Sequence, residues 1–362
     1  MKAAVLHETR QPLRIEDVDI DVPGPREVLV RTGASGVCLT DLKRLEGRQH
    51  VETPVVAGHE AAGTVEAVGE QVTYVRPGDH VVTCMAVFCG YCDKCLRGRP
   101  SLCINRLDTG ARGTGDRPRL SQAGRPVNQA SNLGSLAEQM LVHENALAKV
   151  RDDIPFESLA LMGCAVITGV GAVLTTARVE PGSTVAVIGC GIVGLNCIQG
   201  AALAGALRII AVDTVETKLP MAREFGATEV IDASGGNVAQ KVKDLTGGGV
   251  DYSFEAIGKK ETAEQAYEML GPGGTATVIG EVPEGTKIEI DAWSLLWERR
   301  IQGSNCGSNR FRIDIPRYIE LYLQGRLKLD ELVSRRLKLE QVNEAFEHMK
   351  QGEVTRSVVT FD

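Results

Sequence analysis

Residues 184–213, TVAVIGCGIVGLNCIQGAALAGALRIIAVD, decide the fold. An apolar run rich in β-branched residues leads through a glycine-rich turn into an apolar segment of helical length, and a second apolar run, RIIAVD, follows. A strand, a tight turn, a helix and a second strand in this order are typical of a right-handed βαβ unit. The stretch therefore predicts the first two strands of a doubly wound, parallel α/β sheet.

The turn itself has the pattern of a dinucleotide site. Gly189 permits a tight turn, Gly191 lets the backbone approach a pyrophosphate, and Gly194 lets the helix pack closely on the strand. The first N–H groups of the helix would bind the phosphates. Asp213 closes the second strand, 19 residues after Gly194. Its carboxylate would accept hydrogen bonds from the adenosine ribose and repel a 2′-phosphate, which predicts NAD rather than NADP.

The alternation continues toward the C-terminus. Predicted strands and helices follow one another in the segments ETKLPMAREFG, TEVID, VAQKVKDLTG, VDYSFEA, KETAEQAYEMLG, GTATVIG and RIQGS. Strands that alternate with helices indicate crossover connections and a parallel sheet. We expect the glycine clusters at 247–249 and 271–274 to turn the chain between these elements.

The flanking regions have a different character. Up to about residue 150 the chain reads as short β segments separated by Gly and Pro, such as EVLVRTGASG, AAGTVEAVG and HVVTCMAV. The tail from about residue 305 contains two amphipathic helical patterns and ends in SVVTF. The segment 108–132 is polar, rich in Gly and Arg and without a period, which predicts a long surface loop.

Composition narrows the class of protein. With 40 Lys and Arg against 47 Asp and Glu, the net charge is −7, which argues against nucleic acid or an anionic membrane surface as the main partner. Residues 158–177 and 184–207 carry no charge and approach the length of a membrane span. Glycines and polar residues interrupt both, so we expect core segments. The amino terminus lacks the apolar stretch of an export signal, which predicts a cytoplasmic protein.

Five of the ten cysteines fall between residues 84 and 103. Such clustering in a reducing compartment indicates metal rather than disulfides. Four thiols with the spacing x2-x2-x7 allow one loop to wrap a tetrahedral zinc ion, which predicts a closed, structural site formed by Cys89, Cys92, Cys95 and Cys103. An iron–sulfur cluster or a redox relay is the alternative. Cys84, outside the pattern, is expected to be an ordinary buried thiol.

These motifs together resemble one family. GVCLTD at 36–41, AGHEAAGTVEAVG at 57–69, RPGDHV at 76–81, the four-cysteine loop and the GCGIVG turn resemble the zinc-dependent medium-chain alcohol dehydrogenases over essentially the whole chain. The resemblance implies an α/β fold made of a GroES-like, β-rich catalytic domain (residues 1–165 and 305–362) and a Rossmann NAD-binding domain (residues 166–304). It also implies a homodimer or a homotetramer.

The resemblance further implies a catalytic zinc, the second zinc per chain, held by Cys38, His59 and Cys164 with one position left open. Cys164 follows only from the match of MGCAVITGVG to the family. Asp41 is similar to the residue that orients the ligand histidine, and Glu60 to a carboxylate beside the metal. Three residues match positions that reach NAD: Lys218 at the ribose, Arg356 at the pyrophosphate and Thr168 at the nicotinamide.

The implied reaction is reversible hydride transfer between an alcohol and NAD. Zinc would lower the pKa of the alcohol, Thr40 would carry its proton away, and the hydride would pass to the nicotinamide. Lys43 stands where many members place the histidine that ends the proton relay, and a lysine is a poor acceptor at neutral pH. Leu39 replaces a basic residue that often touches the pyrophosphate.

The expected substrate is a bulky alcohol. Family members that prefer ethanol narrow the site with large side chains, whereas the matching positions here are Met85, Ala130 and Ser131. Met adapts to irregular shapes, and the two small residues leave room. Gln49 and Asn305 match the mouth or wall of the same pocket, where they would offer hydrogen bonds to an oxygenated substrate.

We consider four alternative functions for a protein with this sequence. A zinc-free reductase of the same superfamily is disfavoured by the three ligand residues. A nicotinoprotein, which never releases its NAD, is compatible with Leu39. Glutathione-dependent formaldehyde oxidation needs an anion site that the sequence does not reveal. A non-catalytic protein of the dehydrogenase fold is disfavoured because an open zinc site serves chemistry.

Overall fold

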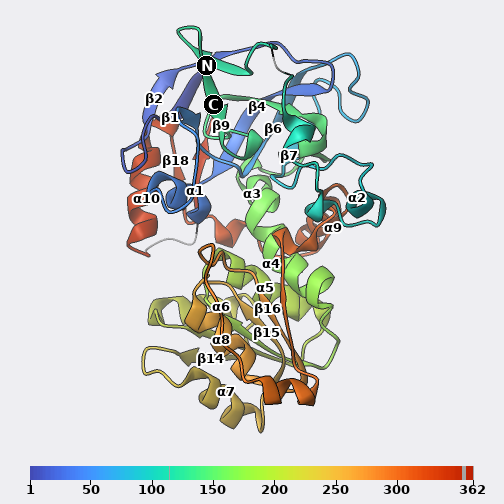
Figure 1. Ribbon diagram of the computed structural model, residues 1–362, viewed down its shortest axis with the longest axis vertical. Coiled ribbons are helices and arrows are strands. Elements are labelled where there is room, and N and C mark those ends of the chain that lie inside the picture. Colours follow the sequence, from blue (N-terminus) through green and yellow to red (C-terminus); the bar gives the residue numbers. More distant parts are fainter. Residues whose placement is uncertain (114, 353–355, 362) are drawn as a thin grey trace. The chain divides into compact units, whose positions relative to one another are not determined.

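The computed structural model describes residues 1–113, 115–352 and 356–361, and the chain divides into two units (Figure 1). Unit 1 comprises Met1–Cys164, Arg310–Gly325 and Leu329–Asp362. Unit 2 comprises Ala165–Asn309 and Arg326–Lys328. The middle of the sequence therefore forms one unit, and the N-terminal part and the tail form the other.

Unit 2 is built on a parallel sheet whose order is β14-β13-β12-β15-β16-β17. Its strands are β12 (Thr184–Ile188), β13 (Arg208–Asp213), β14 (Glu229–Asp232), β15 (Val250–Glu255), β16 (Leu270–Val278) and β17 (Arg300–Gly303). In chain order the first strand lies at the centre, with the next two on one side and the last three on the other. This is the doubly wound order 3-2-1-4-5-6, so the predicted fold class is confirmed.

Five helices of unit 2 connect or adjoin these strands: α4 (Ile167–Gly171), α5 (Ile192–Ala204), α6 (Leu219–Glu224), α7 (Val238–Thr246) and α8 (Lys260–Glu268). Helix α5 is apolar on all sides and nine of its thirteen residues are buried. A helix that is hydrophobic all round belongs in a core. The burial of α5 accounts for most of the uncharged run at 184–207.

Unit 1 contains two largely antiparallel sheets, with strand orders β2-β1-β5-β9-β8-β3 and β11-β7-β6-β4-β19-β18, and β10 pairs with β4. Their strands are β1 (Lys2–Leu6), β2 (Arg14–Asp17), β3 (Asp19–Ile20), β4 (Glu27–Gly36), β5 (Val55–Val56), β6 (Ala61–Val68), β7 (His80–Thr83), β8 (Leu120–Gln122), β9 (Arg125–Gln129), β10 (Gln139–His143), β11 (Leu147–Val150), β18 (Arg335–Leu337) and β19 (Ser357–Thr360). Its helices are α1 (Leu39–Leu45), α2 (Asp93–Leu96), α3 (Phe156–Leu161), α9 (Phe311–Leu323) and α10 (Val342–Lys350).

Two sequence-based expectations were wrong. The segment 108–132 is not one long loop, because β8 and β9 form a hairpin within it. Ala123 and Gly124, both with positive φ, make the two-residue turn that such hairpins favour. Leu120 and Val127 face each other across the strands and are buried. Because β8 and β9 contain so few apolar residues, the sequence shows no alternation of apolar and polar residues that would predict these strands.

The second correction concerns the glycine cluster at 271–274, which lies inside β16 rather than in a turn. Val250 pairs with Leu270, and the next pair is Tyr252 with Thr275, so β16 carries extra residues opposite a single residue of β15. A bulge of this kind absorbs residues without ending the strand. Glycine suits it because Gly273 has a φ of 77°.

Residues Phe156–Ala177 form one helical stretch that is long and apolar enough to cross a membrane. In its most apolar 18-residue window, 72% is buried inside the protein. Burial on this scale agrees with the expected core segment. Within the stretch, Met162–Val166 and Ala172–Ala177 form π-helical turns.

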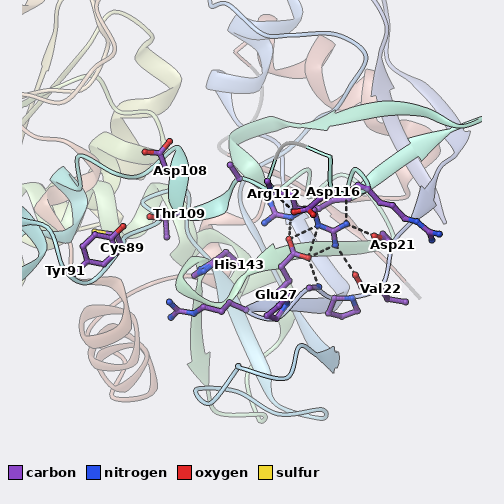
Figure 2. Close-up of a pocket in the computed structure, with 18 residues that line it drawn as sticks. Asp21, Val22, Glu27, Cys89, Tyr91, Asp108, Thr109, Arg112, Asp116 and His143 are labelled. Atoms are coloured by element: carbon purple, nitrogen blue, oxygen red, sulfur yellow. Dashed lines mark hydrogen bonds and ion pairs between the residues drawn. The ribbon is translucent and has the colours of Figure 1, made fainter.

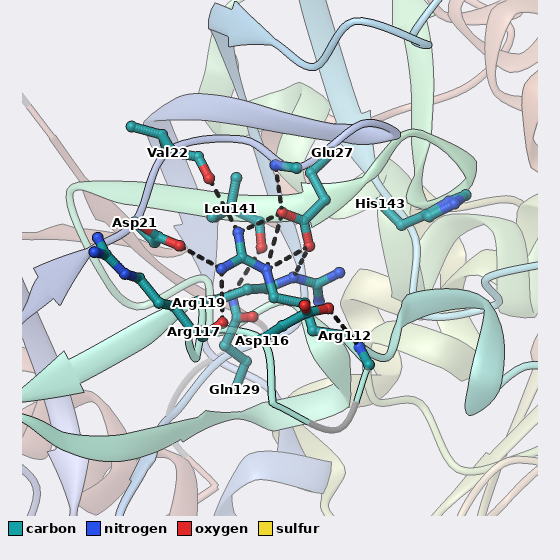
Figure 3. A network of polar contacts seen from close by, with 12 residues as sticks. Asp21, Val22, Glu27, Arg112, Asp116, Arg117, Arg119, Gln129, Leu141 and His143 are labelled. Atoms are coloured by element: carbon teal, nitrogen blue, oxygen red, sulfur yellow. Dashed lines mark hydrogen bonds and ion pairs between the residues drawn. The ribbon is translucent and has the colours of Figure 1, made fainter.

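A buried polar network ties the 108–119 segment to the start of β4 (Figure 3). The Glu27 carboxylate accepts hydrogen bonds from Arg112 Nη2 and from Arg119 Nε, both at 2.6 Å. Arg112 also pairs with Asp21. Burial alone would raise the pKa of Glu27, but the two guanidinium groups lower it to about 2. The ion pairs therefore stabilise the folded state.

We expect Glu27→Gln to destabilise the protein by about 3 kcal/mol at pH 7, since the pKa of Glu27 lies roughly two units below its ordinary value. Because the pKa of Glu27 is lower in the folded state than in the unfolded state, its carboxylate stabilises the folded protein fully above about pH 4.5. This contribution is lost as the pH falls toward 2. The midpoint of thermal unfolding should therefore differ most between variant and wild type near neutrality. Glu66→Gln, which removes a half-exposed partner of Arg31, is the control and should cost under ~1 kcal/mol. Equal midpoints for the two variants would contradict the argument.

Candidate active site and metal centres

Cys38, His59 and Cys164 come together in unit 1. Cys38 is the residue before α1, His59 lies just before β6, and Cys164 belongs to the π-helical turn that follows α3. Their ligand atoms lie within 4.8 Å of one another. His59 is fully buried, whereas Cys164 is partly exposed. The structure thus joins three potential ligands that are up to 126 positions apart in the sequence.

The separation of the ligand atoms fits a zinc ion. Cys164 Sγ lies 3.5 Å from His59 Nε2. Zinc–sulfur and zinc–nitrogen bonds of about 2.3 and 2.0 Å, set at a tetrahedral angle, place the two ligand atoms about 3.5 Å apart. Burial alone would lower the pKa of His59, but the Asp41 carboxylate and the Cys38 thiol raise it well above its ordinary value. The surroundings therefore favour positive charge at this position, as a cation requires.

Asp41 fixes the orientation of the ligand histidine. Its Oδ1 lies 3.0 Å from His59 Nδ1, and its side chain is 1% exposed. A carboxylate can only accept, so Nδ1 carries the proton and Nε2 presents its lone pair. A hydrogen bond of this type holds the imidazole in the tautomer that binds metal.

Glu60 and Arg356 form a second buried pair beside the ligands. Arg356 Nη2 lies 3.4 Å from Glu60 Oε2, and Nη1 donates to the carbonyl of Val37 at 2.6 Å. Both side chains are at most 3% exposed. The predicted reach of Arg356 to a pyrophosphate stays a prediction, and its pairing with Glu60 was not visible in the sequence.

Gly163 explains how Cys164 reaches the cluster. A Cβ at Gly163 would lie 2.2 Å from the backbone oxygen of Thr83 in β7. Only glycine permits so close an approach between the helical turn and the strand. Turns of the π type concentrate at functional sites in proteins.

The four-cysteine loop forms a closed set. Cys89 and Cys95 Sγ are 3.9 Å apart, as are Cys92 and Cys103 Sγ. A tetrahedral ZnS4 centre with bonds of about 2.3 Å separates its sulfurs by about 3.8 Å. Hydrogen bonding from the backbone of Cys95 lowers the pKa of Cys92 to about 6, whereas burial raises the pKa of Cys95 to about 12 and also raises that of Cys103. The metal itself would therefore have to stabilise part of the thiolate charge. Four ligands leave no open position, so the loop fits a structural ion.

The GCGIVG turn of unit 2 has the geometry that a dinucleotide needs. Gly189 has a φ of 95°, and a Cβ on Gly194 would lie 1.7 Å from the Gly189 carbonyl oxygen. A Cβ on Gly191 would meet nothing within 4 Å, so open space lies in front of the N-terminus of α5. A side chain is therefore disfavoured at Gly189 by its positive φ and at Gly194 by the backbone, whereas Gly191 faces the space where a pyrophosphate would lie.

Asp213 ends β13 beside this turn. Its Oδ2 accepts from Cys190 N at 2.7 Å and its Oδ1 accepts from Val215 N at 2.9 Å. The carboxylate is thereby held in place, and each oxygen keeps a further lone pair for a ribose hydroxyl. Lys218 lies partly exposed in the 3-10 turn that follows, and Thr168 is partly exposed in α4.

Comparison with known proteins decides the family. A family model described as zinc-binding dehydrogenase matches residues 193–324, and one described as alcohol dehydrogenase GroES-like domain matches residues 24–152. A probable S-(hydroxymethyl)glutathione dehydrogenase of Schizosaccharomyces pombe is 38% identical over 99% of this chain and 96% of its own. The chain belongs to the zinc-dependent medium-chain alcohol dehydrogenase family. The predicted class of enzyme, its zinc and its nicotinamide cofactor are thereby confirmed.

Solved structures of the family agree with this assignment. A zinc-binding domain alcohol dehydrogenase protein from Burkholderia ambifaria superposes with a TM-score of 0.95 at 37% identity, covering 100% of this chain and 98% of that one. Benzyl alcohol dehydrogenase from Acinetobacter calcoaceticus superposes with a TM-score of 0.94 at 33% sequence identity. The superposition covers 100% of this chain and 99% of that one.

The predicted substrate residues of this alcohol dehydrogenase fall in both units. Met85 is partly exposed beside a core cluster, whereas Ala130 is buried within another cluster and leaves little surface for a ligand. The Ser131 hydroxyl is buried without a hydrogen-bond partner among the described residues. Gln49 follows α1 and is partly exposed, and Asn305 is exposed in unit 2. Their joint role stays a prediction.

A separate cavity of about 550 Å³ lies in unit 1 of the alcohol dehydrogenase, and its lining includes none of the predicted substrate residues. Figure 2 shows Tyr91 and Cys89 on one side of it and the Glu27–Arg112 pair on the other. Its lining includes Cys89 of the structural site but no member of the catalytic cluster. We assign no role in the reaction to this cavity.

Proposed function

We propose that the protein oxidises bulky primary or secondary alcohols, and reduces the matching carbonyls, with NAD as the hydride carrier. The observation that carries this proposal is the set Cys38, His59 and Cys164, which offers three ligands where a closed site has four. Unit 1 would serve as the catalytic domain, and unit 2, with its glycine turn, as the nucleotide domain.

The residues around the cluster have separate tasks. Zinc, when bound, supplies a Lewis acid that makes a hydroxyl group at the open position more acidic. Asp41 holds the imidazole of His59 in place. Thr40, partly exposed in the first turn of α1, accepts the substrate proton and passes it on. Lys43 lies one helical turn further, on the same face, where its amine would shape the exit of the proton.

The proposal is tested by incubating the purified enzyme with NAD and a panel of alcohols while NADH absorbance is recorded. The panel contains ethanol, a branched aliphatic alcohol, benzyl alcohol and a terpenoid alcohol. We expect kcat/KM for the ring-bearing and branched members to exceed that for ethanol by well over tenfold, because each additional buried CH₂ contributes about 0.8 kcal/mol. A preference for ethanol would contradict the proposed substrate class.

Met85→Trp should erase most of that advantage while ethanol turnover changes by less than about threefold. Met85 is a pocket candidate with a partly exposed apolar side chain, which packs against one core cluster. Ala111→Trp, at an exposed position of the same unit, is the control and should leave both rates unchanged. An unaltered substrate ranking in Met85→Trp would remove this residue from the pocket.

Asp213 supports the choice of NAD over NADP. A 2′-phosphate would approach a carboxylate that two backbone bonds hold in place, and like charges this close cost several kcal/mol. We expect NAD to be favoured by at least ~10²-fold in kcat/KM, and Asp213→Gly to reduce this ratio toward one. Asp232→Gly, at the end of the neighbouring strand, is the matched control and should keep the preference. Equal wild-type rates with both cofactors would contradict the assignment.

A second candidate function comes from the name of the S. pombe relative, S-(hydroxymethyl)glutathione dehydrogenase. Adding glutathione and formaldehyde to the panel tests it, because the adduct forms spontaneously in the cuvette. Turnover of the adduct faster than of every simple alcohol would favour this function. Denaturing the purified protein and searching the supernatant for NAD tests the nicotinoprotein alternative in the same preparation.

A homodimer is supported by the edge of the unit 2 sheet. Strand β17 is an edge strand, and its flanking turn exposes Trp293, Leu296 and Trp297 at 57–70%. Exposed apolar residues beside an unpaired strand edge suit pairing with a second copy about a two-fold axis. Leu296→Glu should shift the sedimentation mass toward the monomer, whereas Leu207→Glu, equally exposed in the same unit, should not. A monomeric or tetrameric wild type would overturn the dimer.

We further propose a cytoplasmic location. All ten cysteines are present as free thiols, and six of them belong to the two metal clusters. Thiols in such number stay reduced in the cytosol and would be prone to oxidation outside it. Fractionation of the native host followed by immunoblotting tests this location.

A further inference from the structure

A largely buried arginine, Arg44, lies beside the carboxylate that orients the ligand histidine. Arg44 follows Asp41 by three positions on α1, so the two side chains share one face of the helix. Arg44 Nη1 lies 3.8 Å from Asp41 Oδ1, and the arginine side chain is only 13% exposed. This nitrogen has no hydrogen-bond partner among the described residues. At 3.8 Å the contact is an ion pair rather than a hydrogen bond.

The oxygen that faces Arg44 is also the one that holds His59. Asp41 Oδ1 lies 3.0 Å from His59 Nδ1. One carboxylate oxygen therefore serves two partners, the imidazole that presents Nε2 to the metal and a guanidinium that keeps its charge at any pH at which enzymes work. The other oxygen of Asp41, Oδ2, is buried and makes no hydrogen bond in the described part of the chain.

The charges around the site balance only when Arg44 is counted. Two thiolates neutralise a zinc ion, and the two buried carboxylates beside them, Asp41 and Glu60, each face one arginine. Within the part of the chain that the structure describes, Arg44 is the guanidinium recorded at Asp41, so its loss would leave this carboxylate with the metal as its main compensation. More of its negative charge would then pass through the hydrogen bond to His59 and on to the ion.

We propose that Arg44 is a positioning residue that sets the electron-withdrawing power of the catalytic metal by sharing Asp41 Oδ1 with His59. The guanidinium draws charge from the Asp41–His59 hydrogen bond, which makes the imidazole a weaker donor. The ion is then held less tightly and polarises a bound oxygen more strongly. This inference rests on the proposed catalytic zinc site.

The test compares Arg44→Met, which removes the charge at similar length, with Arg44→Lys, which keeps a cation. Purified holoenzyme is mixed with a chelator, and release of the catalytic zinc is followed with a metallochromic indicator. We expect Arg44→Met to release this ion about tenfold more slowly and, although it holds the metal more tightly, to turn over more slowly. Arg44→Lys should restore both rates toward wild type. Arg48→Met, which removes a half-exposed cation just beyond α1, is the control and should change neither.

A purely structural role predicts the opposite sign. If Arg44 only anchored α1, its loss would loosen Asp41 and speed the release of zinc, and this result would overturn the inference. An unchanged release rate would overturn it as well. If Arg44→Met does not fold, Arg44→Gln, which keeps a polar head group, carries the same comparison.

Two further measurements separate this inference from the proposed function. In an Asp41→Asn background, Arg44→Met should no longer alter the release rate, since the shared oxygen is then uncharged. After replacement of the catalytic ion by Co²⁺, the visible absorption bands of Arg44→Met should move to shorter wavelength, as a stronger imidazole donor requires. A wild-type enzyme with one zinc per chain would refute the catalytic site itself, whereas two zinc ions with unaltered Arg44 variants would refute only the role of Arg44.

Discussion

Replacing His59 with alanine is expected to reduce kcat by at least ~10⁴-fold while leaving a folded protein that binds NAD. The imidazole supplies one of three ligands, and the remaining two thiols cannot hold a catalytic ion in a defined geometry. A metal acting as a Lewis acid lowers the pKa of a bound hydroxyl by about eight units, so its loss removes most of the rate enhancement.

Three measurements on His59→Ala distinguish loss of metal from loss of fold. Metal analysis should give one zinc per chain instead of two, circular dichroism should match wild type, and NADH fluorescence should still report cofactor binding. His143→Ala is the matched control, because His143 lies outside both metal clusters, and it should keep two zinc ions and its activity. Turnover within tenfold of wild type in His59→Ala would exclude the zinc mechanism.

Cys92→Ser is expected to produce the second large effect, on stability rather than on chemistry. Structural zinc contributes about 10–16 kcal/mol in small zinc-binding folds, which equals or exceeds the 5–15 kcal/mol that stabilises a typical domain. The side chains of the four-cysteine loop pack mainly on one another and on Phe88, so the metal is the main support of this loop.

We expect Cys92→Ser to lose one zinc ion, to unfold at least about 10 °C earlier and to aggregate on storage. Cys84→Ala, which alters a buried cysteine just outside the ligand set, is the control and should retain both ions. A Cys92→Ser protein with two zinc ions and a wild-type unfolding midpoint would show that the loop does not bind a structural metal.

The nucleotide unit was predictable because its signals are local. The alternation of apolar runs with helical segments recovered all six strands of the parallel sheet. The order of the strands was not predicted, because right-handed crossovers are compatible with more than one doubly wound order. The glycine turn was predictable for the same reason, since each of its glycines meets a steric requirement within a few residues. The four-cysteine loop also follows from spacing alone.

Features that depend on contacts between distant segments were not predictable from the residues alone. Cys164 stands in an apolar run in which nothing marks it as a ligand, and only the family resemblance singled it out. The β8–β9 hairpin was missed because its strands bury only Leu120 and Val127 against the core. The ion pair between Arg356 and Glu60 joins residues 296 positions apart, which no periodicity can reveal.

Arg44 is a different case, because its spacing to Asp41 was visible. Residues three apart on a helix are neighbours, so an acidic residue at 41 and a basic one at 44 predict an ion pair. The sequence could not show that both would be buried, and burial is what turns a common surface pair into a charge that acts on the metal.

The two clusters also differ in when, during the life of the chain, they can capture an ion. Cys89 and Cys103 close a loop of 15 residues, whereas Cys38 and Cys164 close one of 127. Chain entropy makes the longer closure costlier by about 2 kcal/mol before any packing compensates it. The Arg356 guanidinium that pairs with Glu60 lies, moreover, 192 positions beyond Cys164, the last of the three ligands. The structural ion can therefore be acquired once residue 103 has been made, while the catalytic ion must wait for Cys164 and, for its full surroundings, for Arg356.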